Sequence, residues 1–286
     1  TYQFSSFGIE DGLCHEFTYT INQDENGFLW IGTTQGLCRF DGYNFESEFR
    51  GDTLPATITN TSLLDSQGRL WFGHTDGLIS VLQDRKFKVI KPNADFRSVI
   101  NEIVEDENGN ILLLFQQSGV LIIKPDNALK YISEPFAGKF LSSMHFTEDG
   151  NLLVGTFDGL SLYRISGEDE FVHTGNLPGI QYTRVQSIVK GINENSYWIG
   201  TEDEGLFKLT GNGYNPENYT VQKVGVDKGL EYSSIPSIVI DGTRRLWISD
   251  YGNGVYRFDI DDEENLLSSV LFDKKKGLPN HYINNM

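Results

Sequence analysis

Short runs of alternating apolar and polar residues, each followed by a nearly all-apolar run, recur along the whole chain. Residues 19–22 (YTIN) are typical of the first kind and residues 70–73 (LWFG) of the second. Alternation predicts a half-buried strand, whereas a short continuous apolar run predicts a strand buried on both faces. A turn rich in Asp, Asn and Gly joins the two runs, and two more short strands follow, the last of them polar. The pattern therefore predicts four antiparallel strands in each unit.

Copies of this unit can be aligned on an aromatic residue or leucine in the apolar run. The aligned residues are Trp30, Trp71, Leu112, Leu153, Trp198 and Trp247. Neighbouring copies lie 41 residues apart at first, then 45 and 49 residues apart. This period, with four strands per unit, is typical of a β-propeller. We expect the aligned Trp or Leu to pack between neighbouring blades, and the Gly two residues later, where present, to allow close approach of the next sheet.

The predicted fold is all-β, a β-propeller of four-stranded antiparallel blades with six complete repeats and fragments of a seventh blade. Residues 1–286 are interpreted as a single propeller domain. Its parts are an outer strand at 1–7, blades at about 14–49, 56–90, 98–132, 140–174, 183–224 and 233–272, and the start of a further blade at 277–286. Two closures agree with these ends: an incomplete seven-bladed ring, or a six-bladed ring with spare ends. The chain lacks an initial Met and a signal-like start, which indicates a processed or excised piece.

Composition and charge narrow the possible partners. The chain has 23 basic and 40 acidic residues, for a net charge of −17. Such a charge repels phosphate backbones and anionic membrane surfaces, so nucleic acid is not an expected partner. No apolar stretch is long enough to span a bilayer. Two cysteines, Cys14 and Cys38, are too few for a disulfide framework; two unpaired thiols are the favoured interpretation, with a single bridge as the alternative.

The first repeat carries a family likeness. Residues 12–45, GLCHEFTYTINQDENGFLWIGTTQGLCRFDGYNF, resemble the two-component regulator propeller repeat. The shared features are a Gly-Leu start, an Asp-x-x-Gly turn, a Leu-Trp-Ile-Gly-Thr strand, a Gly-Leu pair and a Phe-Asp-Gly close. The repeats aligned on Leu112 and Leu153 lack the Trp and match only in spacing and turn.

The resemblance implies a setting. Such propellers form the extracytoplasmic sensory part of hybrid histidine kinases, which are frequent in gut Bacteroidetes and regulate polysaccharide utilisation. The implied function is to sense a polysaccharide breakdown product and to signal to a membrane histidine kinase. The implied location is the periplasm, as part of an inner-membrane protein. The implied partners are a second propeller and a kinase downstream in the same polypeptide, and a second copy in a full-length homodimer. Kinase activity would belong to the downstream part, so this chain is expected not to be an enzyme.

Candidate binding residues come from the loops on one expected face, which collects the loops between second and third strands and the blade-entry loops. The first set comprises Gln35, His74, Asp76, Gln116, Gln117, Phe157, Asp158, Glu202, Asp203, Asp250, Tyr251 and Asn253. The entry loops add His15, Phe96, Arg97, Tyr182, Arg184, Tyr232 and His281. Aromatic rings beside amides and charged groups suit an oligosaccharide or another neutral small ligand. Solvated loops of an ordinary propeller have the same composition, so both interpretations stay open.

No catalytic residue, metal ligand or cofactor site is predicted. The five histidines show no metal-ligand spacing, and the segments at 24–27 and 106–110 lack most of the ligands of a calcium loop. No nucleophile elbow is present. Two alternatives to a sensor remain: a carbohydrate-active enzyme, either a lyase or a glycosidase, and a structural or dimerisation propeller whose ligand binds elsewhere.

Overall fold

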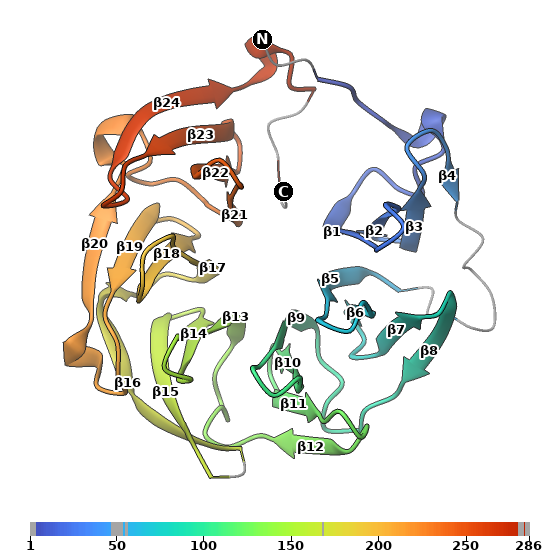
Figure 1. The fold of residues 1–286 in the computed structure, drawn as a ribbon, viewed down its shortest axis with the longest axis horizontal. Helices are drawn as coiled ribbons and strands as arrows, with labels where there is room; N and C mark the ends of the chain where they lie inside the picture. Colours follow the sequence, from blue (N-terminus) through green and yellow to red (C-terminus); the bar gives the residue numbers. More distant parts are fainter. Residues whose placement is uncertain (1–3, 47–53, 55–56, 168, 280–282, 284–286) are drawn as a thin grey trace. The chain divides into compact units, whose positions relative to one another are not determined.

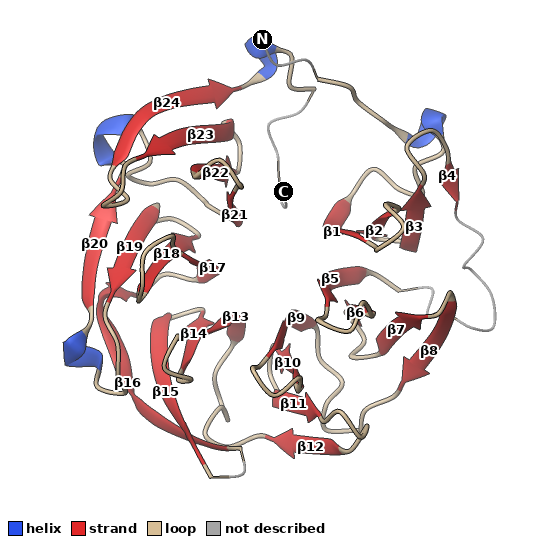
Figure 2. Cartoon of the chain, viewed as in Figure 1, coloured by secondary structure: helices blue, strands red, loops and turns tan. Residues whose placement is uncertain are grey.

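A computed structural model of the protein describes residues 4–46, 54, 57–167, 169–279 and 283. Within these residues the strands form six four-stranded antiparallel sheets, in each of which the spatial order of the strands follows the sequence (Figures 1 and 2). We number these sheets blades 1 to 6. Helical structure in the described residues consists of short 3-10 turns, Ile9–Asp11, Pro216–Asn218, Val226–Lys228 and Lys274–Lys276.

The strands have the following bounds. Blade 1 contains β1 (Thr18–Gln23), β2 (Leu29–Thr33), β3 (Gly36–Phe40) and β4 (Phe45–Glu46). Blade 2 contains β5 (Thr59–Leu64), β6 (Leu70–His74), β7 (Ile79–Gln83) and β8 (Lys86–Ile90). Blade 3 contains β9 (Ile100–Glu105), β10 (Ile111–Phe115), β11 (Gly119–Ile123) and β12 (Leu129–Ile132). Blade 4 contains β13 (Leu141–Phe146), β14 (Leu152–Thr156), β15 (Gly159–Ser166) and β16 (Glu170–Gln181). Blade 5 contains β17 (Val185–Lys190), β18 (Ser196–Thr201), β19 (Leu206–Thr210) and β20 (Thr220–Val224). Blade 6 contains β21 (Ser237–Ile240), β22 (Arg245–Asp250), β23 (Gly254–Ile260) and β24 (Leu266–Phe272).

The predicted fold class, an all-β propeller built from four-stranded antiparallel blades, is confirmed. The chain divides into two compact units, which we describe separately. The N-terminal unit, Ser5–Leu141, contains blades 1 to 3. The C-terminal unit, Ser142–Met286 with the first four residues, contains blades 4 to 6. The number of blades in a closed ring, and a single domain over residues 1–286, stay predictions.

The repeated glycine of the second strand lies against the next blade, as predicted. In the N-terminal unit, a Cβ added at Gly73 would lie 2.8 Å from the Cβ of Ile100 at the start of β9. In the C-terminal unit, a Cβ added at Gly155 would lie 2.9 Å from the Cβ of Val185 at the start of β17. Real Cβ atoms do not approach so closely, so these positions require glycine for the blades to pack.

The repeated tryptophan also packs between blades. The Trp30 ring of blade 1 lies 6.2 Å from the Phe72 ring and 5.5 Å from the Phe87 ring of blade 2, measured between centroids. Trp198 of blade 5 is fully buried in a cluster with Ile248 and Phe258 of blade 6. Burial of such large apolar surfaces is the main favourable contribution to folding, so these rings hold neighbouring blades together.

A carboxylate in the turn before the apolar strand fixes the tryptophan. In blade 2, Oδ1 of Asp65 accepts hydrogen bonds from the N–H groups of Gln67 and Arg69, and Oδ2 accepts one from the indole N–H of Trp71 (2.8 Å). The Nε of Arg69 donates to the same carboxylate (2.6 Å). The corresponding indole bonds join Trp30 to Asp24 and Trp247 to Asp241. In these three blades the Asp six residues before the Trp thus closes the turn and orients the ring.

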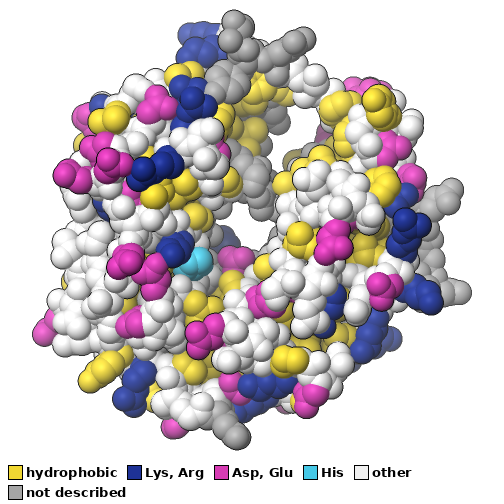
Figure 3. All heavy atoms as spheres, viewed as in Figure 1, with side chains coloured by type: hydrophobic (Ala, Val, Ile, Leu, Met, Phe, Trp, Pro, Cys, Tyr) yellow, Lys and Arg dark blue, Asp and Glu magenta, His cyan; other side chains and the backbone are white. Residues whose placement is uncertain are grey.

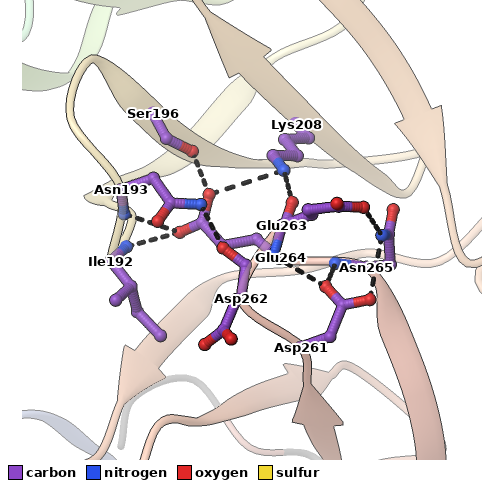
Figure 4. A network of polar contacts seen from close by, with 9 residues as sticks. All are labelled: Ile192, Asn193, Ser196, Lys208, Asp261, Asp262, Glu263, Glu264 and Asn265. Atoms are coloured by element: carbon purple, nitrogen blue, oxygen red, sulfur yellow. Dashed lines mark hydrogen bonds and ion pairs between the residues drawn. The ribbon is translucent and has the colours of Figure 1, made fainter.

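Blade 5 closes the turn before its tryptophan differently, because Ile192 lies six residues before Trp198, where blades 1, 2, 3 and 6 have Asp. Glu264, from the β23–β24 hairpin of blade 6, reaches into this turn and is 1% exposed. Its carboxylate accepts hydrogen bonds from the N–H of Ile192 and the hydroxyl of Ser196, and lies 3.5 Å from the ammonium of Lys208 (Figure 4). The indole N–H of Trp198 has no hydrogen-bond partner among the described residues.

The cysteines correct the favoured interpretation of the sequence. Cys14, in the segment entering blade 1, and Cys38 of β3 form a disulfide with a Cα–Cα distance of 5.8 Å. The entry segment folds back beside the third strand, which no property of two isolated cysteines in the sequence reveals. A cross-link over 24 residues stabilises a fold by about 3 kcal/mol, and such bonds persist in oxidising compartments.

The ends of the chain are described only in part. Residues 4–7, the described part of the predicted outer strand, are not assigned to a strand. The Phe4 ring nevertheless packs edge-on against Phe272 of β24, with centroids 5.5 Å apart. Residues 1–3 and most of the predicted further blade at 277–286 lie outside the described residues.

Candidate functional site

Blade-entry loops and the loops between second and third strands lie together within each blade. In blade 5 the N–H of Glu202 donates to the carbonyl of Arg184 (2.9 Å). In blade 6 the N–H of Tyr251 donates to the carbonyl of Ser234 (2.9 Å). Backbone hydrogen bonds therefore bring the two predicted sets of loops to one surface of each blade.

In the N-terminal unit the predicted residues are held by their own loops. Gln35 is exposed, and its N–H donates to the hydroxyl of Thr33 (3.1 Å). Asp76 is exposed, and its Oδ1 accepts from the N–H of Leu78 (3.2 Å). Arg97, Gln116 and Gln117 lie in the loops of blade 3. A cavity of about 390 Å³ in this unit is lined by other residues, from the β1–β2 turn of blade 1 and the β7–β8 hairpin of blade 2.

His74 does not reach a surface where a ligand could contact it. It is 1% exposed, and its ring nitrogens lie 3.3 Å from the hydroxyl of Thr59 and 2.8 Å from that of Ser80. Burial lowers its pKa to about 4, and the charge of Asp76 opposes this shift. His74 is therefore a neutral part of the interior of blade 2 at physiological pH.

The remaining entry-loop predictions have different outcomes. Phe96 is 1% exposed and packs against Phe115 and Tyr131, so it belongs to the core. His15 is half-buried beside Phe17, with ring centroids 5.6 Å apart. His281 lies outside the described residues.

In the C-terminal unit, predicted residues of blades 4 and 5 form a first cluster. The guanidinium carbon of Arg184 lies 4.4 Å from the centroid of the Phe157 ring. Tyr182 is 89% exposed, and its N–H donates to the carbonyl of Asp158 (3.0 Å). Burial lowers the pKa of Arg184, while the charge of Glu202 opposes that shift. The cluster offers an aromatic face beside a cation, which can stack on one face of a ligand and donate hydrogen bonds to it.

Predicted residues of blade 6 form a second cluster and line a pocket. The pocket has a volume of about 490 Å³, and its walls include Tyr232, Asp250, Tyr251 and Asn253. Tyr232 is 72% exposed and Tyr251 is 49% exposed, so both rings are accessible. A concave site with aromatic walls and a few convergent polar groups is the usual form of a small-molecule site.

Asp250 is the polar centre of this pocket. It is 1% exposed, and its Oδ2 accepts hydrogen bonds from the hydroxyl of Ser233 (2.8 Å) and from Nδ2 of Asn253 (3.0 Å). Its Oδ1 is buried and has no hydrogen-bond partner among the described residues. Burial raises the pKa of Asp250, and the two hydrogen bonds oppose this shift.

Sequence reasoning missed some residues of these surfaces. Glu231 and Ser233 line the pocket beside Tyr232, and their position in the same entry loop was the signal that could have identified them. Lys223 lies with its ammonium 5.3 Å from the centroid of the Tyr232 ring and 2.8 Å from Oε2 of Glu204. Lys223 lies in the polar outer strand β20 and not in a loop, so its sequence position did not indicate that it would lie near Tyr232.

Asp203 is a predicted residue that supports its own loop. It accepts a hydrogen bond from the hydroxyl of Thr183, which joins the blade 5 entry loop to the β18–β19 loop. On the face drawn in Figure 3, acidic and basic side chains are interspersed.

Neither metal ligation nor a membrane span is indicated by the part of the chain that the structure describes. Those residues contain no group of three or more His, Cys, Asp or Glu side chains that could hold a metal ion. The same residues include no helix that is long and apolar enough to cross a membrane.

Comparisons with known proteins agree with the repeat pattern. Residues 12–35 match the model of the two component regulator propeller family. This confirms the resemblance predicted from the first repeat. Histidine kinase P4 from Formosa agariphila is 46% identical over 43 residues, which are 15% of this chain and 3% of that relative.

Solved structures with the same fold include an extracellular domain and a lyase. The extracellular domain of the putative hybrid two component system BT4673 from B. thetaiotaomicron matches 94% of this chain and 35% of its own length, with a TM-score of 0.71 and 23% identity. Virginiamycin B lyase from Staphylococcus aureus matches 90% of this chain and 84% of its own length, with a TM-score of 0.71 and 17% identity. The chain thus spans about a third of that extracellular domain. At identities below 25%, these two structures show the fold alone.

Proposed function

We propose that this chain is the ligand-sensing part of a two-component system, and that it binds a fragment of a polysaccharide on the loops of its C-terminal unit. The signal would pass to a histidine kinase that lies further along the same polypeptide, through a second propeller, in a homodimeric protein. The chain itself would carry out no catalysis.

The observation that carries this proposal is the pocket in blade 6. It brings together Tyr232, Asp250, Tyr251 and Asn253, which come from two loops about 20 residues apart in sequence. Tyrosine rings can stack against the apolar C–H faces of a sugar, while carboxylate and amide groups bond to its hydroxyls. The Arg184–Phe157 pair of blade 5 offers a second contact surface for a longer glycan.

Two observations support an extracytoplasmic location. The Cys14–Cys38 disulfide is a bond typical of oxidising compartments such as the periplasm. The B. thetaiotaomicron domain with the same fold is extracellular. We infer that the chain lies in the periplasm, as part of an inner-membrane protein.

An enzyme is the second candidate, because a lyase shares the fold over most of its length. The pocket offers Asp250 as an acid or base, since burial raises its pKa. A structural propeller, whose ligand binds in another part of the full-length protein, is the third.

Isothermal titration calorimetry against a panel of oligosaccharides tests the proposal. We expect saturable binding, with Tyr232→Ala weakening it by about tenfold through the loss of a stacking surface. Tyr43→Ala is the matched control, because Tyr43 is 88% exposed and is not among the residues that line the pocket.

The three candidates give different results. Saturable binding without turnover, reduced in Tyr232→Ala and unchanged in Tyr43→Ala, supports the sensor. Release of a shortened or unsaturated sugar, detected by chromatography, would replace the sensor with the enzyme. Absence of binding across the whole panel would favour the structural propeller.

A further inference from the structure

The walls of the blade 6 pocket are acidic and aromatic. Glu231 and Asp250 contribute carboxyl groups, and Tyr232 and Tyr251 contribute rings. Among the described residues that line the pocket, none is Lys or Arg. A ligand with a negative charge would therefore meet repulsion here, and the net charge of −17 adds to it.

The buried carboxyl group of Asp250 has a hydrogen-bonding requirement that the described residues do not satisfy. Ser233 and Asn253 both donate to Oδ2, which leaves Oδ1 without a donor. A buried acceptor without a partner costs free energy, and such exceptions in native proteins are explained by strain, by a functional role, or by a bound water or ion. A donor on the ligand that reaches Oδ1 would remove this cost.

A positive charge on that donor would gain further stabilisation. Burial raises the pKa of Asp250 by penalising its ionised form, and a cation beside the carboxylate favours that form again. Tyrosine rings attract cations through their negatively charged faces. Lys223 illustrates this at 5.3 Å from the Tyr232 ring centroid, and its own charge is balanced by Glu204 at 2.8 Å.

We propose that the blade 6 pocket recognises a protonated primary amine carried by a sugar, with Asp250 accepting its hydrogen bond and the rings of Tyr232 and Tyr251 enclosing it. This inference rests on the proposed function, since it names the class of glycan that the pocket selects. A neutral sugar would retain the ring contacts and lose the charge interaction. An N-acetylated amino sugar would lose the charge and add bulk.

Three disaccharides with the same β-1,4 backbone test this selection, because they differ only in the group at carbon 2. They are the glucosamine dimer with free amines, its di-N-acetylated form, and cellobiose. We expect calorimetry at neutral pH to show the free-amine dimer binding about tenfold or more tightly than the other two. In Asp250→Asn, which keeps the size of the side chain, this preference should fall to less than about twofold.

Two further variants separate the pocket from general effects of charge. Asp95→Asn removes one exposed negative charge in the blade 3 entry loop and should leave the preference unchanged. Tyr232→Ala should weaken binding of all three disaccharides. Thermal unfolding of each variant checks that it is folded before its binding is interpreted.

The outcomes distinguish this inference from the proposed function. Equal binding of the three disaccharides, or a preference for cellobiose, would overturn amine recognition while leaving a glycan sensor intact. Retention of the amine preference in Asp250→Asn would overturn the role of Asp250. Failure of all three disaccharides, with binding of other glycans in the panel, would also overturn amine recognition; failure of every glycan would overturn both.

Discussion

In blades 2 and 5, the turn before the tryptophan needs a carboxylate that accepts its hydrogen bonds. The two blades obtain this carboxylate in different ways. In blade 2 the requirement is met locally, because Asp65 lies six residues before Trp71 and bonds to both the turn and the indole. In blade 5 it is met from the neighbouring blade, because Glu264 caps a turn that lies about 70 residues earlier (Figure 4). Both carboxylates have fully buried side chains.

The two solutions have different consequences. The local carboxylate of blade 2 stabilises one turn and one ring. The carboxylate of Glu264 joins two blades, and it leaves the indole N–H of Trp198 unpaired among the described residues. We infer that blade 5 has exchanged a bond within its own turn for a bond across its junction with blade 6.

Glu264→Ala should produce the largest effect. We expect the free energy of unfolding, measured in urea, to fall by about 3–5 kcal/mol, because the turn N–H of Ile192 and the hydroxyl of Ser196 lose their acceptor. The ammonium of Lys208 loses its carboxylate and keeps only the carbonyl of Glu263. Glu263→Ala is the matched control, since that side chain is exposed and should change stability by less than about 0.5 kcal/mol. A loss below about 1 kcal/mol for Glu264→Ala would mean that the carboxylate does not hold the junction.

Trp71→Phe and Trp198→Phe compare blades 2 and 5 at the level of a single hydrogen bond, that of the indole N–H. Both changes remove similar apolar surface, but only Trp71→Phe removes an indole bond and leaves the Asp65 carboxylate without that donor. We therefore expect Trp71→Phe to cost about 1–3 kcal/mol more than Trp198→Phe in urea unfolding. If both variants lose the same free energy of unfolding, the indole hydrogen bond contributes little to stability. The Asp65 carboxylate of blade 2 would then have no advantage over the Glu264 carboxylate of blade 5.

We expect the smallest effect in blade 6, where Asp241 of the turn bonds to the indole of Trp247 as Asp65 does to that of Trp71. This effect is a pH dependence of stability. Burial acts to raise the pKa of Asp241, but hydrogen bonds from Thr243 and the indole of Trp247 outweigh it and hold that pKa well below its usual range. A lowered carboxyl pKa stabilises the fold above the pKa of the unfolded chain and loses that contribution as the pH falls through the folded value.

Asp241→Asn should therefore lower the melting temperature more at pH 7 than at pH 3 relative to the unchanged protein. Thermal unfolding at the two pH values measures this. If Asp241→Asn lowers the melting temperature by the same amount at pH 7 and at pH 3, Asp241 is not a source of acid sensitivity.

The recurring pattern in the sequence was sufficient to predict the blades. Four short strands, their turns and their order follow from contacts within about 35 residues, and the Asp-x-x-Gly turn recurs in blades 1 to 3 and the strand glycine in blades 1, 2, 4 and 5. Gly73 and Gly155 were predicted to allow close approach of the next sheet, and both do so. The loops that carry Tyr232, Asp250 and Tyr251 were also predicted, because loop positions follow directly from strand order.

Contacts between distant segments could not be predicted in this way. Periodicity does not tell whether a loop side chain points outward, so His74 was predicted to bind a ligand although Thr59 and Ser80 enclose it in blade 2. The Cys14–Cys38 bond depends on an entry segment folding back beside β3. Glu264 lies in an acidic run that resembles an ordinary solvated loop in sequence.

The repeat, the strand order and the loops that could carry a site follow from the amino-acid sequence alone, because they depend on local backbone geometry and on the alternation of apolar and polar positions. The side chains that those loops bury, the pairing of the cysteines and the carboxylate that lacks a donor became known only from the folded structure. These properties depend on the packing of segments from different blades, and burial then sets the cost of each unpaired polar group.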